Sequence, residues 1–136
     1  MQIHQTPDFT KQLKNLTKPK YSGIYGTLKK EIDKFFKQYN TIEKVWDKNY
    51  MLFERMDTIR INKVRLENEL QNSGKSGGFR IIIICDKRDN SIGLLWVYPK
   101  TGPYGSESTN LDLTKKLVKN YAKIKKEGLL EKFEFS

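Results

Sequence analysis

Basic side chains stand at strand positions from which they can meet on one face of a sheet. Lys63 and Arg65 are two residues apart in a predicted strand, so both point from the same face. Arg80 begins the next predicted strand and lies close to them if the two strands form a hairpin. Lys100 ends the third strand and completes a cup of positive charge. We therefore expect a cationic site built on three neighbouring strands.

Such a cup suits the cleavage of RNA through its 2′-hydroxyl. That reaction needs the hydroxyl deprotonated, the pentavalent phosphate stabilised and the 5′-oxygen leaving group protonated. Cations held on a rigid sheet can do this without a metal ion. Lys75, in a predicted turn, is either a contact to the RNA backbone or a solvated lysine. The prediction is a metal-independent site with no cofactor, because the lone Cys85 and lone His4 cannot build a zinc site.

The N-terminal elements follow from capping signals and periodicity. A short strand over residues 1–5 precedes a helix that begins at Thr6-Pro7-Asp8, with a hydroxyl cap, a proline at the first helical position and an acid in the first turn. Pro19 ends it. Apolar residues at three- and four-residue spacing predict a second helix from Ile24 to Tyr39, antiparallel to the first. Residues 40–57 fit either a third helix or a loop whose aromatic residues cover the sheet.

Three consecutive strands and a helix follow. The predicted strands cover residues 58–66, 78–86 and 91–100, and residues 67–76 form the connection between the first two. The middle strand is apolar on both faces and therefore central. In the third, alternation places Ile92, Leu94, Trp96 and Tyr98 on one face. An amphipathic helix around Leu113 to Ile124 ends at Gly128. This order predicts an α+β fold, with an antiparallel sheet packed on an N-terminal helical hairpin.

Composition narrows the class of protein. The 136 residues suffice for one domain, predicted over 1–136, and carry 26 Lys and Arg against 16 acids, a formal charge of +10. Such an excess attracts polyanions. No long apolar run and no signal peptide are evident, so we expect a cytoplasmic protein without a membrane association. Of the two tryptophans, Trp96 is predicted in the core, and Trp46 fits either the core or the surface.

Several motifs together resemble the RelE/ParE family of toxins, over most of the chain. The most specific is the glycine-rich block before an arginine-led apolar strand. The motifs are Gly74-Lys75-Ser76-Gly77-Gly78-Phe79-Arg80, Lys63-Val64-Arg65-Leu66, Leu94-Leu95-Trp96-Val97-Tyr98-Pro99-Lys100, and the opening Thr6-Pro7-Asp8-Phe9 with Leu13-Lys14-Asn15-Leu16. The resemblance implies a RelE-like fold and a toxin of a type II toxin–antitoxin system. It further implies an acidic antitoxin as partner, and cleavage of mRNA on the ribosome that inhibits translation.

The resemblance also implies roles for single residues. Lys63 and Arg65 match strand positions linked to base and phosphate contacts, and Arg80 matches an arginine linked to transition-state stabilisation. Lys100 matches a basic residue that closes the last strand. Tyr98 or Tyr104 is the expected stacking or proton-donating tyrosine, although the loop that holds Tyr104 departs from the family pattern.

Two other functions fit the same sequence. A toxin of this fold can bind and poison DNA gyrase without cutting RNA, and fold alone does not decide between them. A non-catalytic RNA-binding relative is the third hypothesis, and Asn62 and Glu67 beside the basic positions favour it. The clustered cations favour RNA cleavage, because a gyrase binder does not need them. Cell-wide mapping of mRNA ends separates the first two functions.

Overall fold

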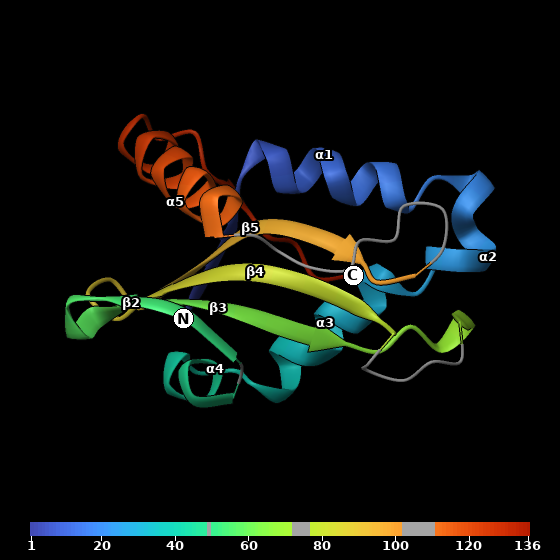
Figure 1. Ribbon diagram of the computed structural model, residues 1–136, viewed down its shortest axis with the longest axis horizontal. Coiled ribbons are helices and arrows are strands. Elements are labelled where there is room, and N and C mark those ends of the chain that lie inside the picture. Colours follow the sequence, from blue (N-terminus) through green and yellow to red (C-terminus); the bar gives the residue numbers. More distant parts are fainter. Residues whose placement is uncertain (49, 72–76, 102–110) are drawn as a thin grey trace.

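The computed structural model describes residues 1–48, 50–71, 77–101 and 111–136. A six-stranded mixed sheet forms its centre, in the order β2-β3-β4-β5-β1-β6 (Figure 1). The strands are β1 (Gln2–Gln5), β2 (Tyr50–Arg55), β3 (Ile59–Leu66), β4 (Phe79–Asp86), β5 (Ser91–Pro99) and β6 (Glu131–Lys132). The helices are α1 (Pro7–Leu16), α2 (Ser22–Tyr25), α3 (Leu28–Gln38), α4 (Ile42–Lys48) and α5 (Leu111–Lys126).

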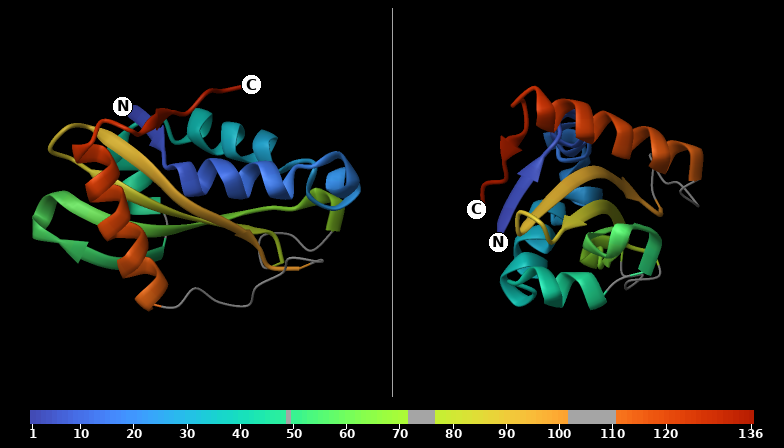
Figure 2. Two further views of the ribbon diagram at one scale, coloured as in Figure 1. Left: turned by 90° about the horizontal axis from the view of Figure 1, so that it is seen from above. Right: turned by 90° about the vertical axis from the view of Figure 1, so that its left-hand side faces the viewer.

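Each face of the sheet has its own core. Helices α1 to α4 pack on one face, where residues such as Phe9, Ile32 and Trp46 join Ile81 and Ile83 of β4. Helix α5 packs on the other face through Leu117, Val118 and Tyr121, against Ile82 and Ile84. Figure 2 shows α1 and α3 on the same side of the sheet and α5 on the opposite side. The tetra-isoleucine strand is buried because it supplies both cores.

The predicted α+β class is confirmed, as are the first helix, its Thr6 cap and the three consecutive strands. The Thr6 hydroxyl accepts a hydrogen bond from the Phe9 backbone N–H at 3.2 Å. The prediction of a purely antiparallel sheet is wrong, because β1 pairs parallel with β5, with Ile3 opposite Ile92. Residues so far apart in sequence carry no local signal of their relative direction.

Two segments differ from the predicted helices. The second helix is divided into α2 and α3 near Gly26, where a Cβ would lie 2.3 Å from the Ser22 carbonyl oxygen. Residues 40–57 are half helix and half strand: α4 is followed by β2, an edge strand that neither alternative predicted. Trp46 of α4 is 5% exposed and belongs to the core, with Arg60 and Lys87 over its ring at 4.6 and 4.1 Å.

A bulge in β5 changes which side chains share a face. Ile82 pairs with Trp96 whereas Ile83 pairs with Leu94, so Leu95 is the extra residue. Ile92 and Leu94 therefore pack with α1 to α4, but Trp96 contacts the core beneath α5. The predicted shared face for residues 92, 94, 96 and 98 is wrong for this reason. The bulge turns Tyr98 toward the face that carries Arg80.

Gly93 lets α5 pack closely on the sheet. A Cβ at this position would lie 2.5 Å from Tyr121 Cε2 and 2.7 Å from Ile84 Cγ2. We expect Gly93→Ala to destabilise the protein by about 1–3 kcal/mol, the usual cost of overpacking a core. Chemical denaturation followed by circular dichroism measures the change. Gly23→Ala is the matched control, because nothing lies within 4 Å of its Cβ. Equal stability of the two variants would contradict the tight contact.

Candidate active site

Three of the predicted site residues lie opposite one another on adjacent strands and form a row across the sheet, which we call the rung. Arg65 pairs with Arg80, and Arg80 pairs with Tyr98 on its other side. Lys63 lies two pairs further along β3, opposite Ile82. Because paired residues project to the same side of a sheet, all four side chains lie on the face that α5 partly covers. Strand pairing thus brings together residues 63, 65, 80 and 98.

A close backbone approach explains the glycine before this rung. A Cβ on Gly78 would lie 1.9 Å from the Leu66 carbonyl oxygen, so no larger residue fits. The Gly78 carbonyl in turn accepts a hydrogen bond from the Lys100 backbone N–H at 2.9 Å. These contacts bind the ends of β3, β4 and β5 together and place Lys100 beside the rung. Gly74, Lys75, Ser76 and Tyr104, which the sequence also singled out, lie outside the described residues.

Arg80 is a buried arginine. Only 4% of it is exposed, because it occupies a central strand between Arg65 and Tyr98. Its Nη1 donates a hydrogen bond to the Phe79 carbonyl at 3.0 Å. Burial, followed by the Arg65 charge, lowers the pKa of Arg80, and Tyr98 opposes that shift. A guanidinium held in this way is preorganised toward an anion, because its position is fixed before the anion binds.

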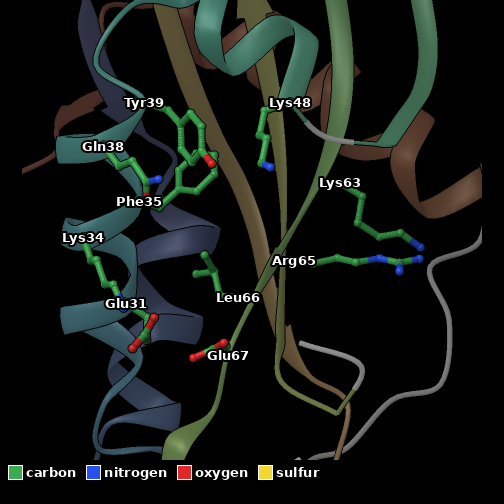
Figure 3. Close-up of a pocket in the computed structure, with 10 residues that line it drawn as sticks. All are labelled: Glu31, Lys34, Phe35, Gln38, Tyr39, Lys48, Lys63, Arg65, Leu66 and Glu67. Atoms are coloured by element: carbon green, nitrogen blue, oxygen red, sulfur yellow. The ribbon is translucent and has the colours of Figure 1, made fainter. Parts of the chain in front are cut away.

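Lys63 is half-buried and its charge is disfavoured. Burial lowers the pKa of Lys63, and the charges of Arg65, Arg80 and Lys100 lower it further. A lysine with a lowered pKa provides a neutral amine at a pH nearer to neutral, which general-base catalysis requires. Figure 3 shows Lys63 and Arg65 extending to the same side, away from α3. The arrangement can therefore bind a phosphate and accept a proton beside it.

Asn62 does not belong to this site. It lies on the opposite face of β3, is fully buried, and its Nδ2 donates to the Val45 and Trp46 carbonyls at 3.4 and 3.3 Å. These bonds hold α4 against the sheet. The interpretation of Asn62 as a sign of a diverged site is therefore wrong, because alternation along a strand points residues 62 and 63 to opposite faces.

One residue that sequence reasoning missed is Glu31 of α3. It lines a groove of about 530 Å³ between α3 and β3, to which Lys63, Arg65 and Glu67 also contribute (Figure 3). Glu31 is only 5% exposed. A signal was present in the sequence: Glu31 stands three residues after Leu28 and four before Phe35, inside the apolar stripe of its helix.

Cys85 is buried on β4 and unreactive. Burial raises the pKa of the Cys85 thiol to about 12, so the thiol stays protonated and unreactive. Residues 1–48, 50–71, 77–101 and 111–136 hold no cluster of three or more His, Cys, Asp or Glu suited to a metal ion. Within the same ranges, no helix combines the length and the apolarity needed to cross a membrane.

Comparison of the chain with protein-family models, with curated proteins and with solved structures found no match. The basic rung and its neighbouring groove are therefore the features from which a function can be argued.

Proposed function

We propose that the chain is the toxin of a type II toxin–antitoxin system, a RelE-like cytoplasmic endoribonuclease that cleaves mRNA on the ribosome. The observation that supports this most directly is the rung of Arg65, Arg80 and Tyr98 with Lys63 beside it. Besides burial, the charges of Arg65, Arg80 and Lys100 lower the pKa of Lys63, so these cations lie close enough to repel one another. Their mutual repulsion is relieved when a phosphate enters. The motifs that resemble the RelE/ParE family are consistent with this proposal.

Each residue of the rung has a role in the proposed reaction. Lys63, as a neutral amine, accepts the proton of the 2′-hydroxyl, and that oxygen attacks the adjacent phosphorus. Arg80 and Arg65 stabilise the charge of the pentavalent phosphate. The bond to the 5′-oxygen breaks, leaving a 2′,3′-cyclic phosphate on one product. Tyr98, which interacts electrostatically with Arg80, donates the proton to the departing oxygen. Lys100 adds positive charge for the incoming strand.

The proposed partner is an acidic antitoxin. A formal charge of +10 on 136 residues favours an acidic segment that becomes ordered when it binds. The antitoxin would inhibit the toxin if this acidic segment covers the rung and excludes mRNA. A neighbouring reading frame that encodes a small acidic protein would support this partner.

Induction of the chain in bacterial cells tests the proposed function. Primer extension on cellular transcripts should show new 5′ ends at a fixed position within codons, because the ribosome presents mRNA in that phase. Pretreatment with an inhibitor of translation initiation should remove the cuts. A DNA-damage response without new mRNA ends would instead assign the chain to the gyrase-binding toxins. Growth without either effect would favour a non-catalytic relative.

A further inference from the structure

The groove between α3 and β3 continues from the basic rung. Lys63 and Arg65 line it, and they are also the residues of β3 that face Arg80. In the described residues the pairing of β2 with β3 reaches Lys63, and beyond this pair Arg65 and Leu66 line the groove at this edge of the sheet. A nucleic-acid strand bound at the rung can pass over this edge and place a neighbouring nucleotide in the groove.

The groove is lined by the buried carboxyl group of Glu31, which shares a side-chain hydrogen bond with Glu69 but has one oxygen without a partner among the described residues. Glu31 Oε1 has no hydrogen-bond partner in the described part of the chain, and the residue is 5% exposed. Figure 3 shows Glu31 directed toward Glu67 across the groove. Burial raises the pKa of Glu31; Lys34 opposes this shift, whereas Glu69 and Glu67 add to it. An unpaired buried acceptor is unfavourable, so a hydrogen-bond donor that reaches this oxygen would be bound more tightly.

The walls of the groove differ from its floor. Lys34 and Lys48 add positive charge, and Tyr39 and Phe35 form an aromatic side with ring centroids 4.8 Å apart. A ligand that fits these surroundings must be anionic at one end, flat in the middle and a donor of N–H groups at the other. A nucleotide combines all three, because its base stacks on aromatic rings while its phosphate meets the cations.

The base edge can be specified further. Burial disfavours the ionised form of Glu31, but N–H donors of a bound ligand would stabilise that form. An ionised carboxylate only accepts hydrogen bonds. Guanine presents N1–H and the N2 amino group side by side, whereas adenine, cytosine and uracil each place an acceptor next to the donor on that edge. We propose that the α3–β3 groove is a guanine-binding subsite for the nucleotide that neighbours the cut, read by Glu31 and Glu67. This proposal rests on the proposed RNA substrate.

Binding of short labelled RNAs tests the subsite apart from catalysis. The probes are oligouridylates that carry one central guanosine, inosine or adenosine, with 2′-fluoro sugars that cannot be cleaved through the 2′-oxygen. Fluorescence anisotropy at fixed salt should give about tenfold tighter binding for guanosine than for adenosine. Inosine, which lacks the N2 amino group, should fall between them. Because the probes cannot be cut, the result does not depend on whether the chain is an endoribonuclease.

Variants of the two acids complete the test. Glu31→Gln and Glu67→Gln should each remove most of the preference for guanosine and leave binding of the adenosine probe unchanged. Glu43→Gln, an exposed acid of α4 outside the groove, is the matched control. Glu67 is only half-buried, so its variant serves if the buried Glu31 variant fails to fold.

Equal affinity of the wild type for all three probes would overturn the subsite, as would a guanosine preference that survives in both glutamine variants. Binding of an oligolysine peptide that both variants lose, without any base preference, would assign the groove to a basic protein segment instead. Codon-phased mRNA cleavage without base preference would refute the subsite and leave the endoribonuclease proposal intact.

Discussion

Replacing Arg80 with glutamine is expected to lower the rate of mRNA cleavage by about 10²–10³-fold, the usual cost of losing one preorganised donor to a transition-state anion. Arg80 is buried on the central strand, with Arg65 on one side and Tyr98 on the other. Its guanidinium therefore needs no reorganisation when charge develops on the phosphate. Glutamine is preferred to alanine because truncation at a buried position would also leave a cavity.

Two further variants make this result interpretable. Arg88→Gln removes an arginine whose side chain is 54% exposed in the turn between β4 and β5, and it should leave cleavage unchanged. Arg80→Lys keeps the charge but loses the forked donor geometry, so an intermediate rate is expected. Single-turnover cleavage on programmed ribosomes measures all three, with thermal unfolding as the check of the fold. Wild-type rates in Arg80→Gln would place the reaction elsewhere on the molecule.

Replacing Lys63 with methionine is expected to lower the cleavage rate by about 10²–10⁴-fold, the range for loss of a general acid or base. The free energy of unfolding of the Lys63→Met variant should not fall, because burial and three neighbouring cations already disfavour the Lys63 charge. Thermal unfolding at neutral pH checks this. A variant that unfolds earlier than the wild type would mean that the loss of activity reports folding and not catalysis.

The pH dependence of cleavage identifies Lys63 as the base. The neutral amine is the active form, so the rate should rise with pH until the lowered pKa of Lys63 is passed and then level off. Arg65 is the strongest of the charges that lower this pKa. In Arg65→Gln the rising limb should therefore move to higher pH, beyond any change in the maximal rate. Burial, together with the charges of Arg80 and Lys100, still lowers the pKa of Lys63 in this variant.

If the rise of the cleavage rate occurs at the same pH in Arg65→Gln as in the wild type, a group other than Lys63 controls it. Lys63→Arg gives a second check, because a guanidinium stays charged throughout the accessible pH range. That variant should lack the rising limb altogether.

Local signals in the sequence were sufficient for the elements that carry the site. The Thr6 cap with Pro7 determines where α1 begins, since both act within one helical turn. Alternation along β3 places Lys63 and Arg65 on one face, because successive side chains of a strand point to opposite sides. The order of β3 and β4 along the chain predicts that Arg80 lies close to Lys63 and Arg65. The register that places Arg65 opposite Arg80 is not predicted, because twelve residues connect the two strands.

Contacts between distant segments decided the rest. The bulge at Leu95 reverses the faces of β5, and only the packing of two cores on β4 and β5 reveals it. The parallel pairing of β1, the strand β2 and the burial of Arg80 and Glu31 likewise depend on neighbours far away in the sequence. A one-residue shift in register moves every later side chain of a strand to the other face. The alternation of residue types along a single strand does not reveal such a shift. The sequence by itself therefore determined which strands carry the cations, whereas the tertiary structure decided that Tyr98 joins them and that Glu31 lies in the groove beside them.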